Sequence, residues 1–276
     1  MMRFYSLLLL ITGSCWLATA ATAQRRAIRD LTLLPEAQVE LALKGNDYIL
    51  AGFSLITNPN SSEGGTFAAG QLRLGYEHFW SEKWSGGATL RILGGGNNES
   101  GDFLGLSGNV TPGLLVRHTG KIGSLNFSQR LGLEYATQIS SSLNNDNTDR
   151  AYARLRFDLD RVFPLSEKLA LRPRIAYELA TYLRLQRDEQ ELKERVVDFG
   201  NLRAELGVRL SPRVDFTPWV ASQTRYFRGL PSLDMNGVII RSGKANFITP
   251  LVGLDVRLTL PTKSANIDRE ALPTQH

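Results

Sequence analysis

The sequence predicts an all-β fold, a transmembrane antiparallel up-and-down β-barrel, and three observations lead to this prediction. Apolar residues recur at every second position from about residue 37 onward, as is typical of strands with two different faces. Short and long connections take turns along the chain. Many of the strands run about 9–16 residues, which is enough to cross an outer membrane at a tilt of roughly 40°.

Residues 1–23 have the form of an export signal. A positive start at Met1–Arg3 is followed by the apolar run Leu7–Ile11, and small residues end the segment at Ala23. We therefore expect cleavage after Ala23 and export to the cell outer membrane. The only cysteine is Cys15, so the exported chain has none and no disulfide framework.

The alternation defines the strands in order along the chain. In the segment 199–210, for example, the charged Arg203 stands between the apolar Leu202 and Ala204. The same pattern predicts eleven strands, at 37–44, 48–56, 67–80, 84–93, 104–118, 124–139, 151–163, 168–184, 199–210, 213–228 and 245–260.

The strand number is open between twelve and ten. Single-chain bacterial barrels have even strand numbers, so a weak strand near 27–34 would complete twelve. A hairpin at 37–56 lying partly outside the barrel would leave ten. We expect about twelve strands, with the barrel over 37–260, an N-terminal segment over 24–36 that contains the weak strand, and a polar tail over 261–276.

The connections predict which end of the barrel faces which compartment. Short polar turns are expected at 81–83, 119–121, 165–167 and 211–213. Longer segments rich in Gly, Asn, Asp or charge lie at 57–66, 94–102, 140–150, 185–198 and 229–244. Membrane barrels have short periplasmic turns and longer extracellular loops, so we assign the two sets in this way.

Aromatic residues close to the short turns predict a belt at the membrane interface, because Trp and Tyr have an apolar body and a polar tip. The predicted interface residues are Tyr76, Trp80, Trp84, Phe127 and Phe163.

Four prolines, Pro112, Pro173, Pro218 and Pro250, fall inside predicted strands. Each removes a hydrogen-bond donor from the ladder, and a closed barrel has no free edge to hold it. We expect bulges or gaps at these positions, and a slip in phase near Pro218 would turn Trp219 outward.

Charged side chains fill the alternate positions that face the lumen. An Arg or Lys facing lipid at mid-depth costs about 2–4 kcal/mol, so only a polar interior accommodates this set. Two interpretations stay open: a water-filled pore in which an arginine excess favours anions, and a lumen blocked by paired charges. The set comprises Arg73, Arg91, Arg117, Arg130, Glu134, Arg154, Arg156, Asp158, Arg172, Arg174, Glu178, Arg203, Glu205, Arg209, Asp255 and Arg257.

The chain resembles the outer-membrane β-barrel proteins of Gram-negative bacteria, and within them a poorly characterised porin-like group. The resemblance rests on Arg-Leu-x-Leu-Glu at 130–134 and Asn-Leu-Arg-x-x-Leu-Gly at 201–207. It implies contact with outer-membrane lipid and lipopolysaccharide, and insertion by the barrel-assembly machinery. The chain departs from many such barrels because it ends in a polar tail instead of an aromatic residue.

The expected role is passive, porin-like passage of small solutes, or a structural or surface role if the lumen is blocked. No catalytic residue, metal site or cofactor is predicted. The alternatives are a lipid-modifying acyl hydrolase using His78 or His118, for which no orienting carboxylate is evident, and a soluble secreted β-sandwich binding protein.

The formal net charge of +5 comes from evenly spread basic residues, which does not favour nucleic acid as a partner. Nothing in the sequence indicates an oligomeric state.

Overall fold

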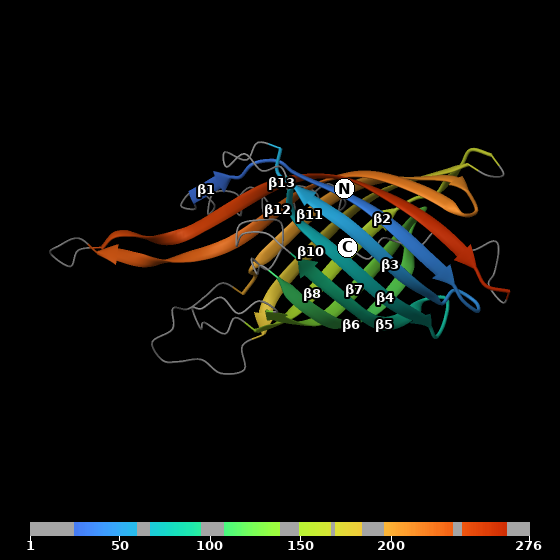
Figure 1. The fold of residues 1–276 in the computed structure, drawn as a ribbon, viewed down its shortest axis with the longest axis horizontal. Helices are drawn as coiled ribbons and strands as arrows, with labels where there is room; N and C mark the ends of the chain where they lie inside the picture. The colour runs from blue at the N-terminus through green and yellow to red at the C-terminus, as the bar shows by residue number, and fades with distance from the viewer. Residues whose placement is uncertain are drawn as a thin grey trace, which may run out of the picture.

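The structure, a computed structural model, describes residues 25–59, 67–94, 108–138, 149–166, 169–183, 196–233 and 239–263 (Figure 1). The predicted signal peptide, most of the polar tail and most of the predicted long loops at 57–66, 94–102, 140–150 and 185–198 lie outside these residues. The long loop predicted at 229–244 is wrong, because most of this segment belongs to the strands β12 and β13. Within them, no helix is long and apolar enough to cross a membrane. The described strands are β1 (Arg25–Ile28), β2 (Thr32–Ala42), β3 (Tyr48–Thr57), β4 (Phe67–Phe79), β5 (Trp84–Gly94), β6 (Asn109–Ile122), β7 (Leu125–Gln138), β8 (Arg150–Asp160), β9 (Phe163–Pro164), β10 (Ala170–Leu183), β11 (Phe199–Ser211), β12 (Val214–Leu233) and β13 (Ile239–Pro261).

Eleven of these strands form a closed ring, which confirms the predicted barrel. Each strand from β2 to β13, leaving out β9, pairs antiparallel with the next, and β13 then pairs with β2 to close the ring. All eleven strands correspond to the eleven segments predicted by the alternation. In Figure 1 the hairpin of β12 and β13 extends well beyond the rest of the ring.

The ring has eleven strands where twelve were expected, and this changes how it closes. In an antiparallel series with an odd number of strands, the first and last strands point the same way and can only pair parallel. This pairing runs from Thr32 beside Leu251 to Ala42 beside Pro261. The expected twelfth strand is instead β1, which pairs parallel with β13 ahead of β2 and so lengthens the seam without widening the ring.

The prolines coincide with interruptions in the ladder, as expected. The pairing of β6 with β7 skips Pro112, and the pairing of β11 with β12 skips Pro218. Pro250 lies opposite the break between β1 and β2. Pro173 lies just past the end of the pairing between β10 and β8, which stops at Arg174.

No slip in phase occurs at Pro218, so Trp219 is not turned outward. Trp219 is 5% exposed and lies in the interior, on the same side of β12 as Thr217. The pairing of β12 with β13 continues without a shift through Pro218, so the gap on the β11 side does not rotate the strand.

Short turns gather at one end of the barrel and the longer connections at the other. The turns between β4 and β5 and between β11 and β12 lie where expected. The turn expected at 119–121 lies instead at 123–124, because β6 continues to Ile122 and Gly123, with a φ of 62°, makes the tight turn.

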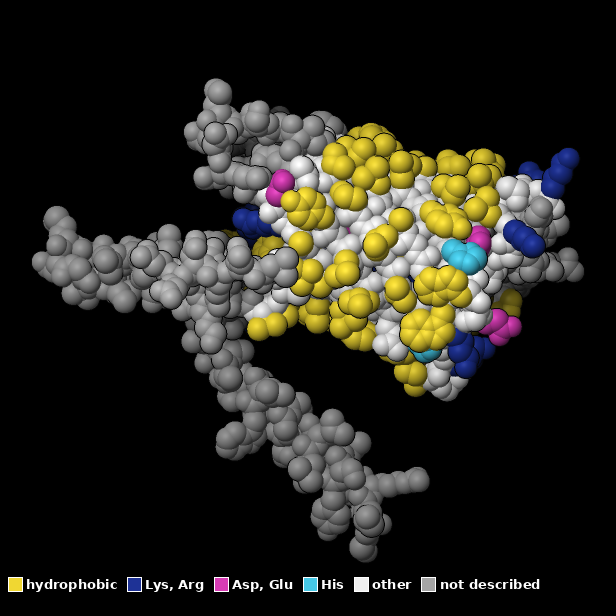
Figure 2. Space-filling view, turned by 90° about the horizontal axis from the view of Figure 1, so that it is seen from below, with side chains coloured by type: hydrophobic (Ala, Val, Ile, Leu, Met, Phe, Trp, Pro, Cys, Tyr) yellow, Lys and Arg dark blue, Asp and Glu magenta, His cyan; other side chains and the backbone are white. Residues whose placement is uncertain are grey.

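The barrel is apolar outside and charged inside. Each of the eleven ring strands contributes at least one large apolar side chain that is exposed on the outer wall. Figure 2 shows these side chains spread across the wall, with charged groups toward the two ends. On the outward alternate positions of these strands, where side chains are described, there is no Asp, Glu, Lys or Arg.

Candidate functional site

The interior of the barrel is the candidate site, because all sixteen charged residues expected in the lumen lie there. Twelve of them are buried, and the other four, Arg91, Glu134, Arg172 and Arg209, are partly buried. They reach the interior because residues at every second position of a strand share one face. Most of them are joined by ion pairs and hydrogen bonds into two separate networks.

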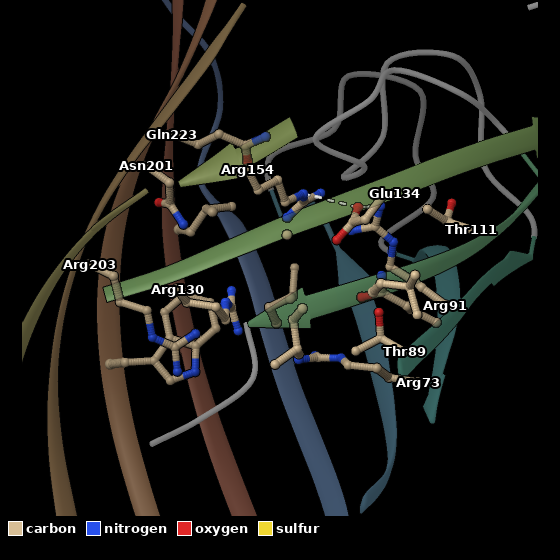
Figure 3. A pocket seen from close by; sticks show the side chains of 17 residues that line it. Arg73, Thr89, Arg91, Thr111, Arg130, Glu134, Arg154, Asn201, Arg203 and Gln223 are labelled. Atoms are coloured by element: carbon tan, nitrogen blue, oxygen red, sulfur yellow. Dashed lines mark hydrogen bonds and ion pairs between the residues drawn. The ribbon is translucent and has the colours of Figure 1, made fainter. Parts of the chain in front are cut away.

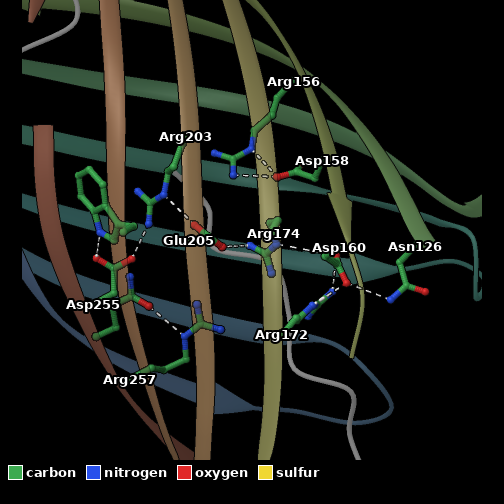
Figure 4. Close-up of polar contacts among 12 residues, drawn as sticks. Asn126, Arg156, Asp158, Asp160, Arg172, Arg174, Arg203, Glu205, Asp255 and Arg257 are labelled. Carbon is green, nitrogen blue, oxygen red and sulfur yellow. Dashed lines mark hydrogen bonds and ion pairs between the residues drawn. The ribbon is translucent and has the colours of Figure 1, made fainter. Parts of the chain in front are cut away.

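The first network runs along the inner wall over neighbouring strands, from β13 to β8 (Figure 4). The Trp219 indole Nε1–H donates to Asp255 at 2.8 Å, and Asp255 also accepts from Arg203 at 2.8 Å. Arg203 stacks on the Trp219 ring, 3.9 Å from its centroid, and pairs with Glu205 at 2.7 Å. Glu205 in turn accepts from Arg174 at 2.5 Å.

The same network continues from Arg174 to the carboxylate of Asp160, 3.8 Å away at the short-turn side of the barrel, and ends there. The two carboxylate oxygens of Asp160 accept one hydrogen bond each from the Arg172 guanidinium, at 2.8 and 2.9 Å, in the bidentate geometry that suits these two groups. The amide of Asn126 on β7 also donates to it at 2.9 Å. Beside this network, Arg156 donates two hydrogen bonds to Asp158 on its own strand.

The second network is an alternating chain of five groups that begins and ends on arginine. Arg91 lies 3.4 Å from Glu134, and Glu134 lies 3.0 Å from Arg154. Arg154 also donates to Glu178 at 3.0 Å, and Glu178 accepts from Arg130 at 2.8 Å. Three arginines therefore share two carboxylates.

Five interior carboxylates were missed by the sequence prediction. All five bind arginines of the predicted set: Glu36 binds Arg73, Glu40 binds Arg257, Glu77 binds Arg117, Asp215 binds Arg209, and Asp160 binds Arg172. Glu77 and Asp160 had a usable signal, because they share the phase of Arg73 and Asp158, whereas Glu36 lies before the predicted start of its strand.

The missed residues change the charge balance of the interior. The eleven arginines of the predicted set meet ten carboxylates, so the arginine excess inferred from the sequence is far smaller than expected. Burial is tolerable for these charges because their partners lie within hydrogen-bonding reach. The interior is thus filled by paired side chains.

A cavity of about 90 Å³ lies between the two networks in the half of the barrel nearer the long connections (Figure 3). Arg73 and Arg91 line one wall, and Asn201 and Arg203 line the opposite wall. This volume holds several water molecules, by the measure that a single water needs about 10–15 Å³.

The predicted interface aromatics lie near the short-turn end. Tyr76, Trp80, Trp84 and Phe163 are exposed on the surface, with Trp80 at 60%. The Trp80 ring covers Gly86, where an added Cβ would lie 2.5 Å from a ring carbon. Phe127 is partly buried and stacks on Phe157, with the ring centroids 6.3 Å apart.

The two described histidines lie on the outer wall near the same turns. His78 Nδ1 lies 2.7 Å from an Asp47 carboxylate oxygen, so the expectation that it has no carboxylate partner is wrong. Asp47 also accepts the backbone N–H of Phe79, which ties the turn after β2 to the end of β4. Ser81 Oγ accepts the backbone N–H groups of its own turn, and His118 packs on Trp84 with ring centroids 4.6 Å apart. His276 lies outside the described residues.

Among the described residues, no group of three or more His, Cys, Asp and Glu side chains is arranged to hold a metal ion. No protein-family model, curated protein or solved structure matches the chain.

Proposed function

We propose that this chain is an outer-membrane β-barrel protein whose lumen is closed by its own ion pairs, and that it has a structural or surface role without enzymatic activity. Export by residues 1–23 and insertion by the barrel-assembly machinery belong to the same proposal. Its outer wall then contacts lipid and lipopolysaccharide.

The inverted distribution of polarity supports the membrane location. Monomeric soluble proteins rarely expose contiguous apolar patches of more than a few hundred Å², whereas here all eleven ring strands present apolar side chains outward. A membrane barrel needs such a band around its full circumference, with a polar interior. Exposed Trp80 and Trp84 near the short turns fit the headgroup level.

The filled interior supports a closed lumen over porin-like passage. Arg203, Asp255 and Trp219 form a packed group beside the cavity, and none is more than 5% exposed. Barrels of about eight strands are filled by side chains, and those of sixteen or more are open. Eleven strands with long, paired arginine and glutamate side chains belong with the filled class.

The membrane location and the closed lumen are tested by two separate measurements. For location, cells expressing the full chain are fractionated, and membranes are washed with alkaline carbonate. We expect the protein to stay in the outer-membrane fraction and to show heat-dependent gel mobility; release without detergent would overturn the membrane location and favour a soluble, secreted barrel.

For the lumen, the refolded protein is inserted into planar bilayers beside a general porin as a positive control. We expect no steady single-channel steps from the protein under conditions in which the porin conducts. Steady steps would overturn the closed lumen and restore porin-like passage, without affecting the location.

A further inference from the structure

The cavity in the lumen has a lining that is rich in guanidinium groups. Five of its lining residues are arginines, and one, Glu134, is a carboxylate. The carboxylates that bind Arg73 and Arg203, Glu36 and Asp255, are not among the residues that line it. The cavity wall therefore presents more positive than negative charge.

Two of these arginines are directly opposed across neighbouring strands. Arg73 on β4 and Arg91 on β5 are partners in the ladder, and both side chains face the interior. Like charges placed directly opposite each other on one face of a sheet are destabilising. An anion between them would remove this cost.

Arg91 is the less completely bound of the two. Its contact to Glu134 is 3.4 Å long, and that carboxylate also binds Arg154 at 3.0 Å. Within the part of the chain that the structure describes, the buried Nε of Arg91 has no hydrogen-bond acceptor. A buried guanidinium with an unused donor costs free energy unless a ligand or water accepts from it.

The alternating chain from Arg91 to Arg130 adds a net positive charge at the same place. Its three arginines share Glu134 and Glu178, so these five groups together carry one net positive charge. Across the cavity, Arg203 and the amide of Asn201 supply further polar groups on the opposite wall (Figure 3). Donors from several directions suit a tetrahedral oxyanion better than a planar carboxylate.

We propose that this cavity binds one small tetrahedral oxyanion, of the class of sulfate or phosphate, with Arg91 as the main donor. The ligand is a free ion and not a lipid headgroup, because the cavity lies inside the ring of strands. The site goes beyond the proposed function and does not depend on it: an anion can occupy the cavity in a membrane barrel or a soluble one.

The test is equilibrium dialysis of the folded, detergent-purified protein against radiolabelled sulfate in a chloride buffer. We expect one sulfate per chain, displaced by phosphate. In the Arg91→Gln variant the apparent Kd should rise about tenfold, the factor that corresponds to about 1.4 kcal/mol. This variant is expected to fold, because Glu134 keeps its ion pair with Arg154.

The matched control is Arg209→Gln, which removes an interior arginine paired with Asp215 and absent from the cavity lining. We expect it to bind sulfate like the unaltered protein, and heat-dependent gel mobility checks that each variant is folded. No sulfate binding by the unaltered protein would overturn the proposal. So would an equal loss of affinity in both variants, which would mean that only the total charge matters.

Discussion

Glu178 is the carboxylate on which the second network depends most. It is 4% exposed and accepts hydrogen bonds from both Arg130 and Arg154. Removing one member of a buried ion pair costs much more than the pair itself contributes, because the remaining charge is left in a medium that solvates it poorly. The network is therefore sensitive to the loss of any shared carboxylate.

We expect Glu178→Gln to lower the free energy of unfolding by about 3–5 kcal/mol, since it leaves two buried guanidinium groups short of an anionic partner. Urea-induced unfolding of the refolded protein measures this change. The matched substitution is Asp215→Asn, whose pair with Arg209 is partly exposed, with side chains 28% exposed for Arg209 and 16% for Asp215. It should cost about 1 kcal/mol or less. Equal losses in the two variants would show that burial does not set the cost of these pairs.

Strand alternation was the part of the fold that the sequence predicted best. All eleven ring strands follow from it, because the outer wall requires apolar residues at one phase and the interior tolerates charge at the other. The sixteen interior residues came from the same phase. The five missed carboxylates show the limit of this approach: Glu36, for example, was lost because the start of β2 was placed too late.

Ring closure could not be predicted from local patterns. Whether β1 forms a twelfth strand or lies in series with β2 depends on which edge of β13 is free once the ring is built. The turn expected at 119–121 failed for a related reason. Polar residues with a glycine suit a turn, but the left-handed conformation of Gly123 completes β6 three residues later.

The parallel seam makes a specific prediction about β2 and β13. Val39 and Leu258 are partners across it, and both side chains are exposed outward. Neighbouring strands lie about 4.8 Å apart, within the range of Cα separations that a disulfide spans. We expect Val39→Cys with Leu258→Cys to form an intrachain disulfide on oxidation, seen as a shift in nonreducing gels, in a chain that lacks residues 1–23 and hence Cys15.

The control pair for the seam is Val39→Cys with Val252→Cys, which uses the same two strands. Val252 is the partner of Leu33, six residues from Val39, so the two sulfurs would be separated by about 20 Å. This pair should stay reduced. Cross-linking of the control pair instead of the test pair would show that the strands close in another register.

At the scale of the whole molecule, the polarity of the barrel is the reverse of that of a soluble protein. Charged groups are gathered inside, where they bind one another, and apolar groups cover the outside. In water the apolar surface would be costly at about 25 cal/mol per Å². In a bilayer the same surface stabilises the folded state, so a single substitution on it can distinguish the two environments.

Leu131 is suited to this test because it lies near the middle of β7, is 53% exposed, and has the apolar Val116 and Leu155 beside it on the outer wall. Within a bilayer, Leu131→Arg should lower the free energy of unfolding by about 2–4 kcal/mol. In water the same exposed substitution should change it by no more than about 0.5 kcal/mol. The control is Leu165→Arg, 58% exposed beside the turn after β9, where an interfacial arginine costs about 0–1 kcal/mol. The measurement is urea-induced unfolding from lipid vesicles. If Leu131→Arg unfolds at the same urea concentration as Leu165→Arg and the unaltered protein, the outer wall does not lie in hydrocarbon.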